Sequence, residues 1–519
     1  MTTEELIAAR RAEPWREALR KSKKNKERTD IPRVEMNELD AEYRSHTRLE
    51  EVNLGLTKEQ AMQEAQRCLD CPNPTCMQGC PVSINIPTFV KNIERGEFLE
   101  AARVLKETSA LPAVCGRVCP QEKQCESKCI HLKMGKPAVA IGYLERFAAD
   151  YERESGNISI PEVAEKNGIK IAVVGSWRHR QPQPPKAEKN GIKIAVVGSG
   201  PAGLSFAGDM AKRGYDVTVF EALHEIGGVL KYGIPEFRLP NKIVDVEIEG
   251  LRKMGVKFMT NCIVGKTISY DDLHADGFKG IFAASGAGLP NFMNIPGENL
   301  VGVMSSNEYL TRVNLMDAAN PDSDTPVLQG KKVAVIGGGN TAMDSVRTAR
   351  RLGAERAMIV YRRSEEEMPA RLEEVKHAKE EGVEFMTLHN PVEYLGDERG
   401  RVKQMRLQKM ELGEPDASGR RRPVPVEGAI ETIDVDEVIV SVGVSPNPLI
   451  PRAFQGLEVS KKGTIVVNEE NMRSALPDVY AGGDIVRGGA TVILAMGDGR
   501  KAAAAMDEAF SDTSPCVDK

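Results

Sequence analysis

The chain has 519 residues, of which 41% are hydrophobic, 28% charged and only 5% aromatic, and it carries 47 glycines. This length predicts several domains, and the composition is typical of a globular protein rich in nucleotide-binding turns. A formal net charge of −5 gives no reason to expect nucleic acid or a membrane surface as a partner. No apolar run approaches the ~20 residues of a membrane helix, and the N-terminus lacks a secretory pattern, so we expect a cytoplasmic protein.

The first third of the chain divides into three segments. Residues 1–65 predict a charged helical arm, whose basic stretch 21–28 is expected to be solvated and flexible rather than a docking site. Residues 66–150 are rich in cysteine, and their cysteine-free part, 86–110, has helical periodicity. Residues 151–190 are polar and contain prolines, which predicts a linker.

A sequence repeat lies within and just after this linker. Ala164–Ser176 recurs identically as Ala187–Ser199. Only the second copy continues into a glycine-rich turn and a helix, so we expect that copy to form the first strand of a sheet. The first copy is expected to be a looped-out insertion or an assembly artefact, because a repeat seen once does not indicate a solenoid.

Eight of the ten cysteines lie between Cys68 and Cys129. The two groups of four are Cys68-x2-Cys71-x4-Cys76-x3-Cys80, followed by Pro81, and Cys115-x3-Cys119-x5-Cys125-x3-Cys129, with Pro120 after Cys119. Disulfides are disfavoured without an export signal, and structural zinc usually takes two Cys-x2-Cys pairs, whereas only one is present. Closely spaced thiolates with a distant Cys-Pro are typical of bacterial ferredoxins, so the spacing favours two [4Fe-4S] clusters and one-electron transfer.

In that ferredoxin pattern the fourth cysteine of a group serves the other cluster, which predicts how the ligands divide. One cluster would take Cys68, Cys71, Cys76 and Cys129. The other would take Cys80, Cys119 and Cys125, completed by Cys115 or by an acidic side chain, for which Glu145 is the candidate. Cys262 and Cys516 stand apart and are expected to be structural thiols.

A first dinucleotide loop follows a predicted strand over residues 192–198. It reads Gly198-Ser199-Gly200-Pro201-Ala202-Gly203, and its glycines allow a pyrophosphate to reach the N-terminus of the next helix. The next strand, 216–220, ends at Glu221, whose carboxylate can accept from both ribose hydroxyls and would repel a 2′-phosphate. A glycine-rich turn without a ligand is the alternative, and the complete strand–turn–helix–strand context argues against it.

A second dinucleotide loop follows a predicted strand over residues 332–337. It reads Gly337-Gly338-Gly339-Asn340-Thr341-Ala342, and the next strand, 357–360, ends in Tyr361-Arg362-Arg363. Two arginines suit the 2′-phosphate of NADP, unless Glu365–Glu367 neutralise them as solvated surface charge. Two such sites predict FAD in the first loop and NADPH in the second. Hydride transfer between stacked cofactors requires little of side chains, so we predict no catalytic residue.

Several longer motifs resemble the small (beta) subunit of bacterial glutamate synthase. They are Glu221-Ala222, the loop of residues 227–240, Glu367-Met368-Pro369-Ala370, the stretch 115–122 and the stretch 481–488, in the right order over residues 35–505. The same module occurs in the large subunit of NADH-dependent ferredoxin:NADP reductase and in dihydropyrimidine dehydrogenase. The resemblance implies an α/β protein with an N-terminal helical double iron–sulfur domain, followed by two Rossmann-type domains of the disulfide-reductase-like flavoprotein class.

The resemblance also implies domain limits and further cofactor contacts. The FAD domain would comprise residues 191–330 and 446–519, interrupted by an NADPH domain at 331–445. The implied cofactor contacts are Gly228 and Arg238 in the loop, Gly286 and Gly443 on crossover strands, Gly483 and Asp484 at the flavin ribityl and phosphate, and Thr491 and Val492 at the start of a helix directed at the flavin ring. In relatives one cluster has a non-cysteine ligand, which supports Glu145 over Cys115.

Function follows from what the chain lacks as well as from what it contains. It has no room for the glutaminase and FMN barrel that glutamate synthesis needs, so we expect it to pass electrons to a separate large subunit. The alternative is the large subunit of an electron-bifurcating transhydrogenase, with a smaller FAD subunit as partner, because residues 111–115 and 144–147 resemble that branch as closely. A disulfide reductase would need a cysteine pair near the flavin, and no cysteine occurs between Cys262 and Cys516. The two intact loops argue against a non-enzymatic cluster scaffold.

Overall fold

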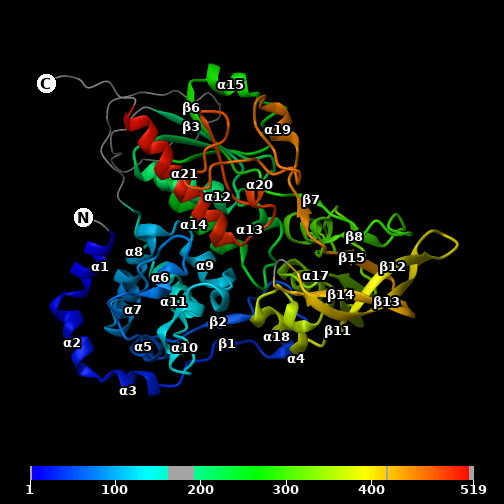
Figure 1. The fold of residues 1–519 in the computed structure, drawn as a ribbon, viewed down its shortest axis with the longest axis horizontal. Helices are drawn as coiled ribbons and strands as arrows, with labels where there is room; N and C mark the ends of the chain where they lie inside the picture. The colour runs from blue at the N-terminus through cyan, green and yellow to red at the C-terminus, as the bar shows by residue number, and fades with distance from the viewer. Residues whose placement is uncertain (1–2, 162–191, 417–418, 513–519) are drawn as a thin grey trace.

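The computed structural model describes residues 3–161, 192–416 and 419–512. Figure 1 shows a helical N-terminal part at the lower left, a first sheet flanked by helices above it, and a second sheet-containing part at the right. Within the described ranges, every helix is too short or too polar to span a lipid bilayer.

The N-terminal part consists of helices around a small apolar core. Its elements are α1 (Thr3–Arg11), α2 (Pro14–Ser22), α3 (Asn25–Asp30), β1 (Asn37–Glu38), α4 (Ala41–Arg44), β2 (Asn53–Gly55), α5 (Lys58–Gln66), α6 (Thr75–Gln78), α7 (Ile86–Glu94), α8 (Phe98–Thr108), α9 (Pro112–Val118), η1 (Gln121–Lys123), η2 (Glu126–Lys128), α10 (Ile130–Lys133) and α11 (Ile141–Ser155). The helical pattern predicted for residues 86–110 is confirmed by α7 and α8. Pro87 and Pro112 lie in the first turns of α7 and α9, where the missing N–H costs nothing. Phe89, Val90 and Ile93 of α7 are fully buried and centre the core.

Helices α1, α2 and α3 form an arm along the outer side of this part (Figure 1). Arg28 of α3 is 1% exposed and pairs with Glu94 of α7 at 2.8 Å. The prediction that residues 21–28 are a solvated, flexible arm is therefore wrong at Arg28, because a buried ion pair fixes that end of the stretch. Lys21 remains exposed, as predicted.

The first sheet is parallel and takes strands from both ends of the remaining chain. Its order is β17 (Val479–Ala481), β6 (Phe278–Ala283), β3 (Lys193–Val197), β4 (Asp216–Phe220) and β5 (Lys257–Met259). The flanking elements are α12 (Pro201–Lys212), α13 (Val229–Tyr232), α14 (Asn241–Lys253), α15 (Tyr270–Ala275), α19 (Leu449–Ala453), α20 (Asp484–Arg487) and α21 (Val492–Asp512). Strand β3 belongs to the second copy of the repeat, as predicted. The first copy, 164–176, lies outside the described residues.

The second sheet is also parallel, in the order β11 (Glu384–Thr387), β10 (Arg356–Tyr361), β9 (Lys332–Ile336), β15 (Glu437–Val440) and β8 (Val303–Ser305). Its helices are α16 (Ser306–Leu310), η3 (Thr311–Leu315), α17 (Asn340–Arg351), η4 (Glu365–Glu367) and α18 (Leu372–Glu380). Strand β8 joins this sheet although it precedes residue 331, where the resemblance places the start of the NADPH domain. An antiparallel sheet of β12 (His389–Gly396), β13 (Val402–Pro415) and β14 (Arg421–Asp434) is attached, and its β13–β14 hairpin projects at the right of Figure 1.

Two short strands connect the sheet-containing units. Strand β7 (Leu289–Pro290) pairs antiparallel with β16 (Val444–Ser445), so the chain leaves the first unit and returns to it side by side. Gly286 and Gly443 lie just before these strands, both with positive φ, at 67° and 104°. The first unit is therefore assembled from two segments with the second unit inserted between them.

Candidate functional site

One group of cysteines surrounds a small cavity in the helical part. Cys68, Cys71, Cys76 and Cys129 all line it, and each is a free, partly exposed thiol. We call these four residues the outer set. Burial raises the pKa of Cys68 to about 11, although the ammonium of Lys91 opposes the rise. The structure thus brings together the four cysteines that the spacing assigned to one cluster.

A second group lies deeper in the helical part. Cys80, Cys119, Cys125 and Glu145 form what we call the inner set. Burial raises the pKa of Cys80 to about 11 and that of Cys125 well above its usual value, and the charge of Glu145 adds to both shifts. Cys119 and Cys125 are buried, with 5% and 8% exposure.

Glu145 of α11 has the features of a ligand without its partner. It is 5% exposed, and in the described part of the chain its Oε1 has no hydrogen-bond partner. Burial and the nearby charge of Glu247 raise its pKa to about 8. Because a buried polar atom is costly unless it is bonded, this carboxylate fits a position beside iron.

Cys115 adjoins the inner set but its thiol is already engaged. The residue is fully buried, and its Sγ lies 3.5 Å from Met496 Sδ of α21 and 3.9 Å from Ser109 Oγ. A hydrogen bond to Cys119, together with burial, raises the pKa of Cys115 well above its usual value. Cys115 and Glu145 therefore both lie beside the cysteines of the inner set, and Glu145 is favoured as its fourth member by its unbonded buried oxygen.

A cavity of about 670 Å³ lies between the two sheet-containing units. Most of the predicted dinucleotide residues line it, namely Gly198, Gly200, Glu221, Gly228, Arg238, Gly286, Gly483, Asp484, Thr491 and Val492 from the first unit and Gly339, Asn340 and Thr341 from the second. Gly203, Gly337, Arg362, Arg363 and Gly443 are not among its lining residues. One cavity reached by both loops is the arrangement that two stacked cofactors require.

The first glycine of each loop is pressed against a neighbouring strand end. Gly198 has φ +104°, and a Cβ there would lie 2.4 Å from the carbonyl oxygen of Ala284. Gly337 has φ +143°, and its Cβ would lie 2.3 Å from the carbonyl oxygen of Ser441. Only glycine fits either turn. Within the described residues, α12 and α17 start without a side-chain cap, so their first N–H groups can bind phosphate.

Glu221 closes the first loop from the end of β4. Its Oε2 accepts from the N–H and the hydroxyl of Ser199, at 2.9 and 2.5 Å, and its Oε1 accepts from Leu223 N at 2.9 Å. The carboxylate is 6% exposed but lines the cavity. It therefore holds the loop in shape and still presents lone pairs to a ribose.

The two arginines after β10 have different surroundings. Arg362 is exposed, whereas Arg363 is 6% exposed and pairs with Asp416 at 2.5 Å. Arg363 Nε also donates to the carbonyl of Arg421 on β14 at 2.8 Å. Arg363 is thus largely used in holding the β13–β14 hairpin, and Arg362 is the arginine available to a phosphate.

The sequence pattern missed how the helical part contacts the cavity. The segment between Cys119 and Cys125 bonds to both nucleotide units. Gln124 Nε2 donates to Thr491 Oγ1 at 3.3 Å, and Lys123 Nζ donates to the carbonyls of Pro369 and Ala370 at 2.9 and 3.0 Å. No local pattern marks contacts between residues 246 or more positions apart.

Arg238, predicted to contact a cofactor, joins the two nucleotide units. It is 8% exposed and pairs with Asp344 of α17 at 2.8 Å and with Glu374 of α18 at 3.2 Å. Its side chain therefore holds the second unit against the first at the wall of the cavity.

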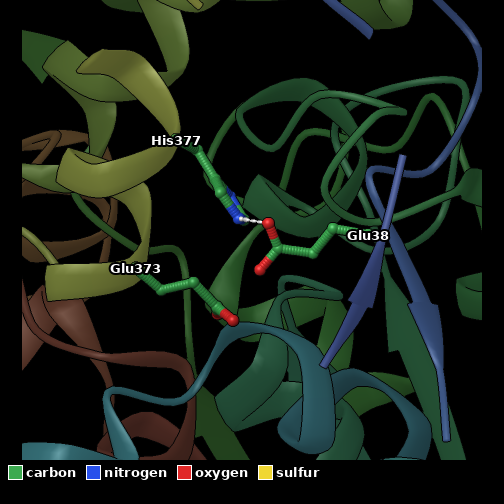
Figure 2. A group of neighbouring side chains, drawn as sticks. All are labelled: Glu38, Glu373 and His377. Carbon is green, nitrogen blue, oxygen red and sulfur yellow. Dashed lines mark ion pairs between the residues drawn. The ribbon is translucent and has the colours of Figure 1, made fainter. Parts of the chain in front are cut away.

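Another cluster of possible metal ligands lies away from the cavity. Figure 2 shows His377 and Glu373 of α18 with Glu38 of β1, and His377 Nε2 lies 3.2 Å from Glu38. Arg44 and Lys376 also contact Glu38, and Arg371 contacts Glu373. Burial opposes ionisation, but His377 and Lys376 bring the pKa of Glu38 down to about 2. The carboxylates are already neutralised by cations, so this cluster is an ionic contact between the helical part and α18.

Comparison with known proteins agrees with this geometry. The family model for dihydropyrimidine dehydrogenase domain II, 4Fe-4S cluster, matches residues 44–157, and that for pyridine nucleotide-disulphide oxidoreductase matches residues 192–509. The structure of Mycobacterium tuberculosis FprA in complex with NADPH has a TM-score of 0.52 and 20% identity, covering 62% of this chain and 85% of that one. Fold and site together define an iron–sulfur flavoprotein oxidoreductase.

The relatives identify the family. The chain is 36% identical over 451 residues to the glutamate synthase [NADPH] small chain of Escherichia coli K12, covering 86% of this chain and 90% of that protein. It is 38% identical over 468 residues to the beta subunit of the NADP(+)-dependent formate dehydrogenase of Moorella thermoacetica, covering 85% and 61%. The chain belongs to the glutamate synthase small chain family.

Membership confirms several predictions. The fold class is as predicted, and the chain is an NADPH-dependent oxidoreductase whose cofactors are FAD, NADPH and [4Fe-4S] clusters. The comparisons do not favour the transhydrogenase alternative.

Proposed function

We propose that this chain is the electron-input subunit of a glutamate synthase. It takes electrons from NADPH through FAD and two clusters, and passes them to a separate large chain that makes glutamate. One observation carries this proposal: the segment bearing Cys119 and Cys125 is bonded to α21 at the cavity and to the loop at Pro369 in the second unit. The cluster ligands and both dinucleotide loops therefore meet at one place.

Each group of residues has a proposed cofactor. FAD would be held by Gly198, Gly200, Gly203, Glu221, Gly228, Arg238, Gly286, Gly483, Asp484, Thr491 and Val492. NADPH would be held by Gly337, Gly339, Asn340, Thr341, Arg362 and Gly443, with Arg363 supporting the same loop from the hairpin. The outer set and the inner set would each hold one cluster, with Glu145 as the non-cysteine ligand.

The residues of the chain bind, orient and shield these groups. The free N–H groups at the starts of α12 and α17 would bind the two pyrophosphates, and Glu221 would orient a ribose. Arg238 fixes the second unit against the first, so that the nicotinamide can meet the flavin in one cavity. When bound, the flavin accepts a hydride and releases single electrons, which the clusters carry.

Coenzyme preference gives a test of the second loop. Because Arg362 is exposed and Arg363 is paired with Asp416, we expect Arg362→Ala to raise the KM for NADPH about 10- to 100-fold, the loss of one or two charge-assisted bonds. The KM for NADH should hardly change. Arg363→Ala is the matched variant, and it should affect the KM for NADPH less. Equal NADPH and NADH effects in Arg362→Ala would contradict the assignment.

The whole proposal is tested on protein purified without oxygen. We expect iron, sulfide and FAD in amounts that fit two clusters and one flavin, and bleaching of the flavin by NADPH in stopped-flow. Adding a glutamate synthase large chain with glutamine and 2-oxoglutarate should then give NADPH-dependent glutamate. Colourless protein with zinc, or glutamate formation that does not need this chain, would overturn the proposal.

We place the protein in the cytoplasm, because its nine described cysteines are all free and thiols persist in reducing compartments.

A further inference from the structure

The loop between the first two cysteines of the outer set contains a constrained, buried acid. Asp70 lies between Cys68 and Cys71, has φ +52° and is 0% exposed. Aspartate tolerates this left-handed conformation better than most residues, but a buried carboxylate needs partners to remain charged.

The N-terminal arm supplies these partners in excess. Arg16 and Arg20 of α2 each pair with Asp70 at 2.6 Å, and Arg11 Nε donates to the Asp70 carbonyl at 2.9 Å. Arg16 is 1% exposed. Two guanidinium groups therefore pair with the single carboxylate beside Cys71, and a third, that of Arg11, bonds to the main chain of the same loop. Burial and the charges of Cys129 and Asp70 raise the pKa of Cys71, and Arg11 opposes them.

A further buried cation lies on the other side of the same loop. Lys91 of α7 is 0% exposed, and its Nζ donates to the carbonyl of Cys68 at 2.6 Å. Its counterion Glu94 is shared with Arg28, which pairs with it at 2.8 Å. Around the 68–71 loop, five cations thus face two carboxylates, and the excess is positive.

Carboxylates, and not cations, are the charged side chains that act most on the inner set. Glu145 is one of its members, and after burial the charges of Glu126 and Glu145 are among those that raise the pKa of Cys125. Glu126 is paired with Arg33, but Glu145 lacks such a partner within the described residues and faces the charge of Glu247. The side-chain carboxylates that act most on Cys125 are thus Glu126 and Glu145, and the ion pair with Arg33 offsets the first of them.

Charge near a cluster shifts its reduction potential, because reduction adds negative charge that cations stabilise and anions oppose. We propose that Arg16, Arg20 and Lys91 raise the reduction potential of the cluster in the outer set above that of the cluster in the inner set, so that electrons from the flavin are drawn outward. This inference rests on the proposed function, in which each set holds one cluster. Arg16, Arg20 and Lys91 are positioning residues that act on the cysteine loop without touching substrate.

Arg20 and Arg10 provide a matched test. Both lie on the arm, with similar side-chain exposure of 21% and 19%, and each pairs with one acid, Arg20 with Asp70 and Arg10 with Glu107 of α8. Arg20→Gln removes a charge beside the outer set and leaves Arg16 to hold Asp70. Arg10→Gln removes the same charge next to an acid that is not in the cysteine loop. Arg20→Lys keeps the charge.

The measurement is a redox titration of the complete, anaerobically purified protein, followed by electron paramagnetic resonance. The signal of the outer set is identified as the one lost in Cys71→Ser. We expect Arg20→Gln to lower the potential of that signal by about 59 mV, a tenfold shift in electron sharing between the sets for a one-electron couple. The inner signal should stay in place, and Arg20→Lys and Arg10→Gln should resemble the unaltered protein.

The possible outcomes distinguish a failure of this inference from a failure of the proposed function. Unaltered protein without two clusters would overturn the proposed function, and this inference with it. Two clusters with an outer potential that is unchanged in Arg20→Gln, or that falls equally in Arg10→Gln, would overturn the inference alone.

Discussion

The outer and inner sets look alike in sequence and differ in the structure. The outer set is partly exposed and its loop is held by cations of the arm and of α7. In the inner set Cys119, Cys125 and Glu145 are buried and Cys80 is partly exposed. The set includes a carboxylate, and its Cys119 and Cys125 flank a segment bonded to both nucleotide units. Under the proposed function, the inner set is therefore the one that faces the flavin, and the outer set is the one that lies nearer the surface.

Under the proposed function, the position of a cluster in the electron path differs from the position of its cysteines in the sequence. The outer set begins the cysteine motif, yet under the proposed function it would receive electrons last. Contacts of the segment 119–125 with Thr491 and Pro369 decide this order.

Removing one ligand from each set should separate their roles most clearly. Cys125→Ser is expected to prevent reduction of either cluster by NADPH while the flavin still bleaches, because the inner set lies between the flavin and the outer set. Cys71→Ser should leave the inner cluster reducible by NADPH. Both variants should lose roughly half of the iron. Stopped-flow absorbance and paramagnetic resonance provide the readouts, and identical behaviour of the two variants would remove the functional distinction.

The fourth ligand of the inner set can be tested by comparing variants of Glu145 and Cys115. Glu145→Ala should lose or convert the inner cluster, because its buried, unbonded oxygen would no longer be available. Cys115→Ala should retain the full iron content, since its thiol contacts Met496 and Ser109. Iron analysis and the inner resonance signal measure both. Full iron in Glu145→Ala with loss in Cys115→Ala would reverse the assignment.

Arg16 tests whether the N-terminal arm stabilises the outer set through its ion pair with Asp70. Arg16→Gln removes a fully buried partner of Asp70, and breaking a buried pair costs about 3 kcal/mol. We expect a lower temperature of iron release from the outer set than from the inner one. Lys21→Gln serves as control, because Lys21 is exposed and its pair with Glu17 contributes little. A similar change in both variants would mean that the arm does not stabilise the outer set specifically.

The difference in solvent exposure between the two sets predicts the smallest of these effects. When the protein is exposed to air, the outer cluster should be lost several-fold faster than the inner one, because access governs thiolate oxidation. The decay of the two resonance signals with time measures this. Loss of the inner signal first would show that burial does not protect that set.

The sequence alone determined the local parts of this protein. Cysteine spacing predicted which four cysteines line one cavity, and the glycine patterns predicted the turns after β3 and β9. Such features follow from short-range geometry, since a tight turn or a ligand loop depends on residues only a few positions apart.

The contacts between segments far apart in the sequence were decided by tertiary structure alone. Arg363 pairs with Asp416, 53 residues away, Arg16 with Asp70, 54 residues away, and Lys123 contacts Pro369, 246 residues away. No periodicity records such pairs, because they form only where whole units pack together. For that reason the arm appeared flexible in sequence, the two arginines of the second loop appeared equivalent, and the order of the two cysteine sets relative to the cavity emerged only from the fold.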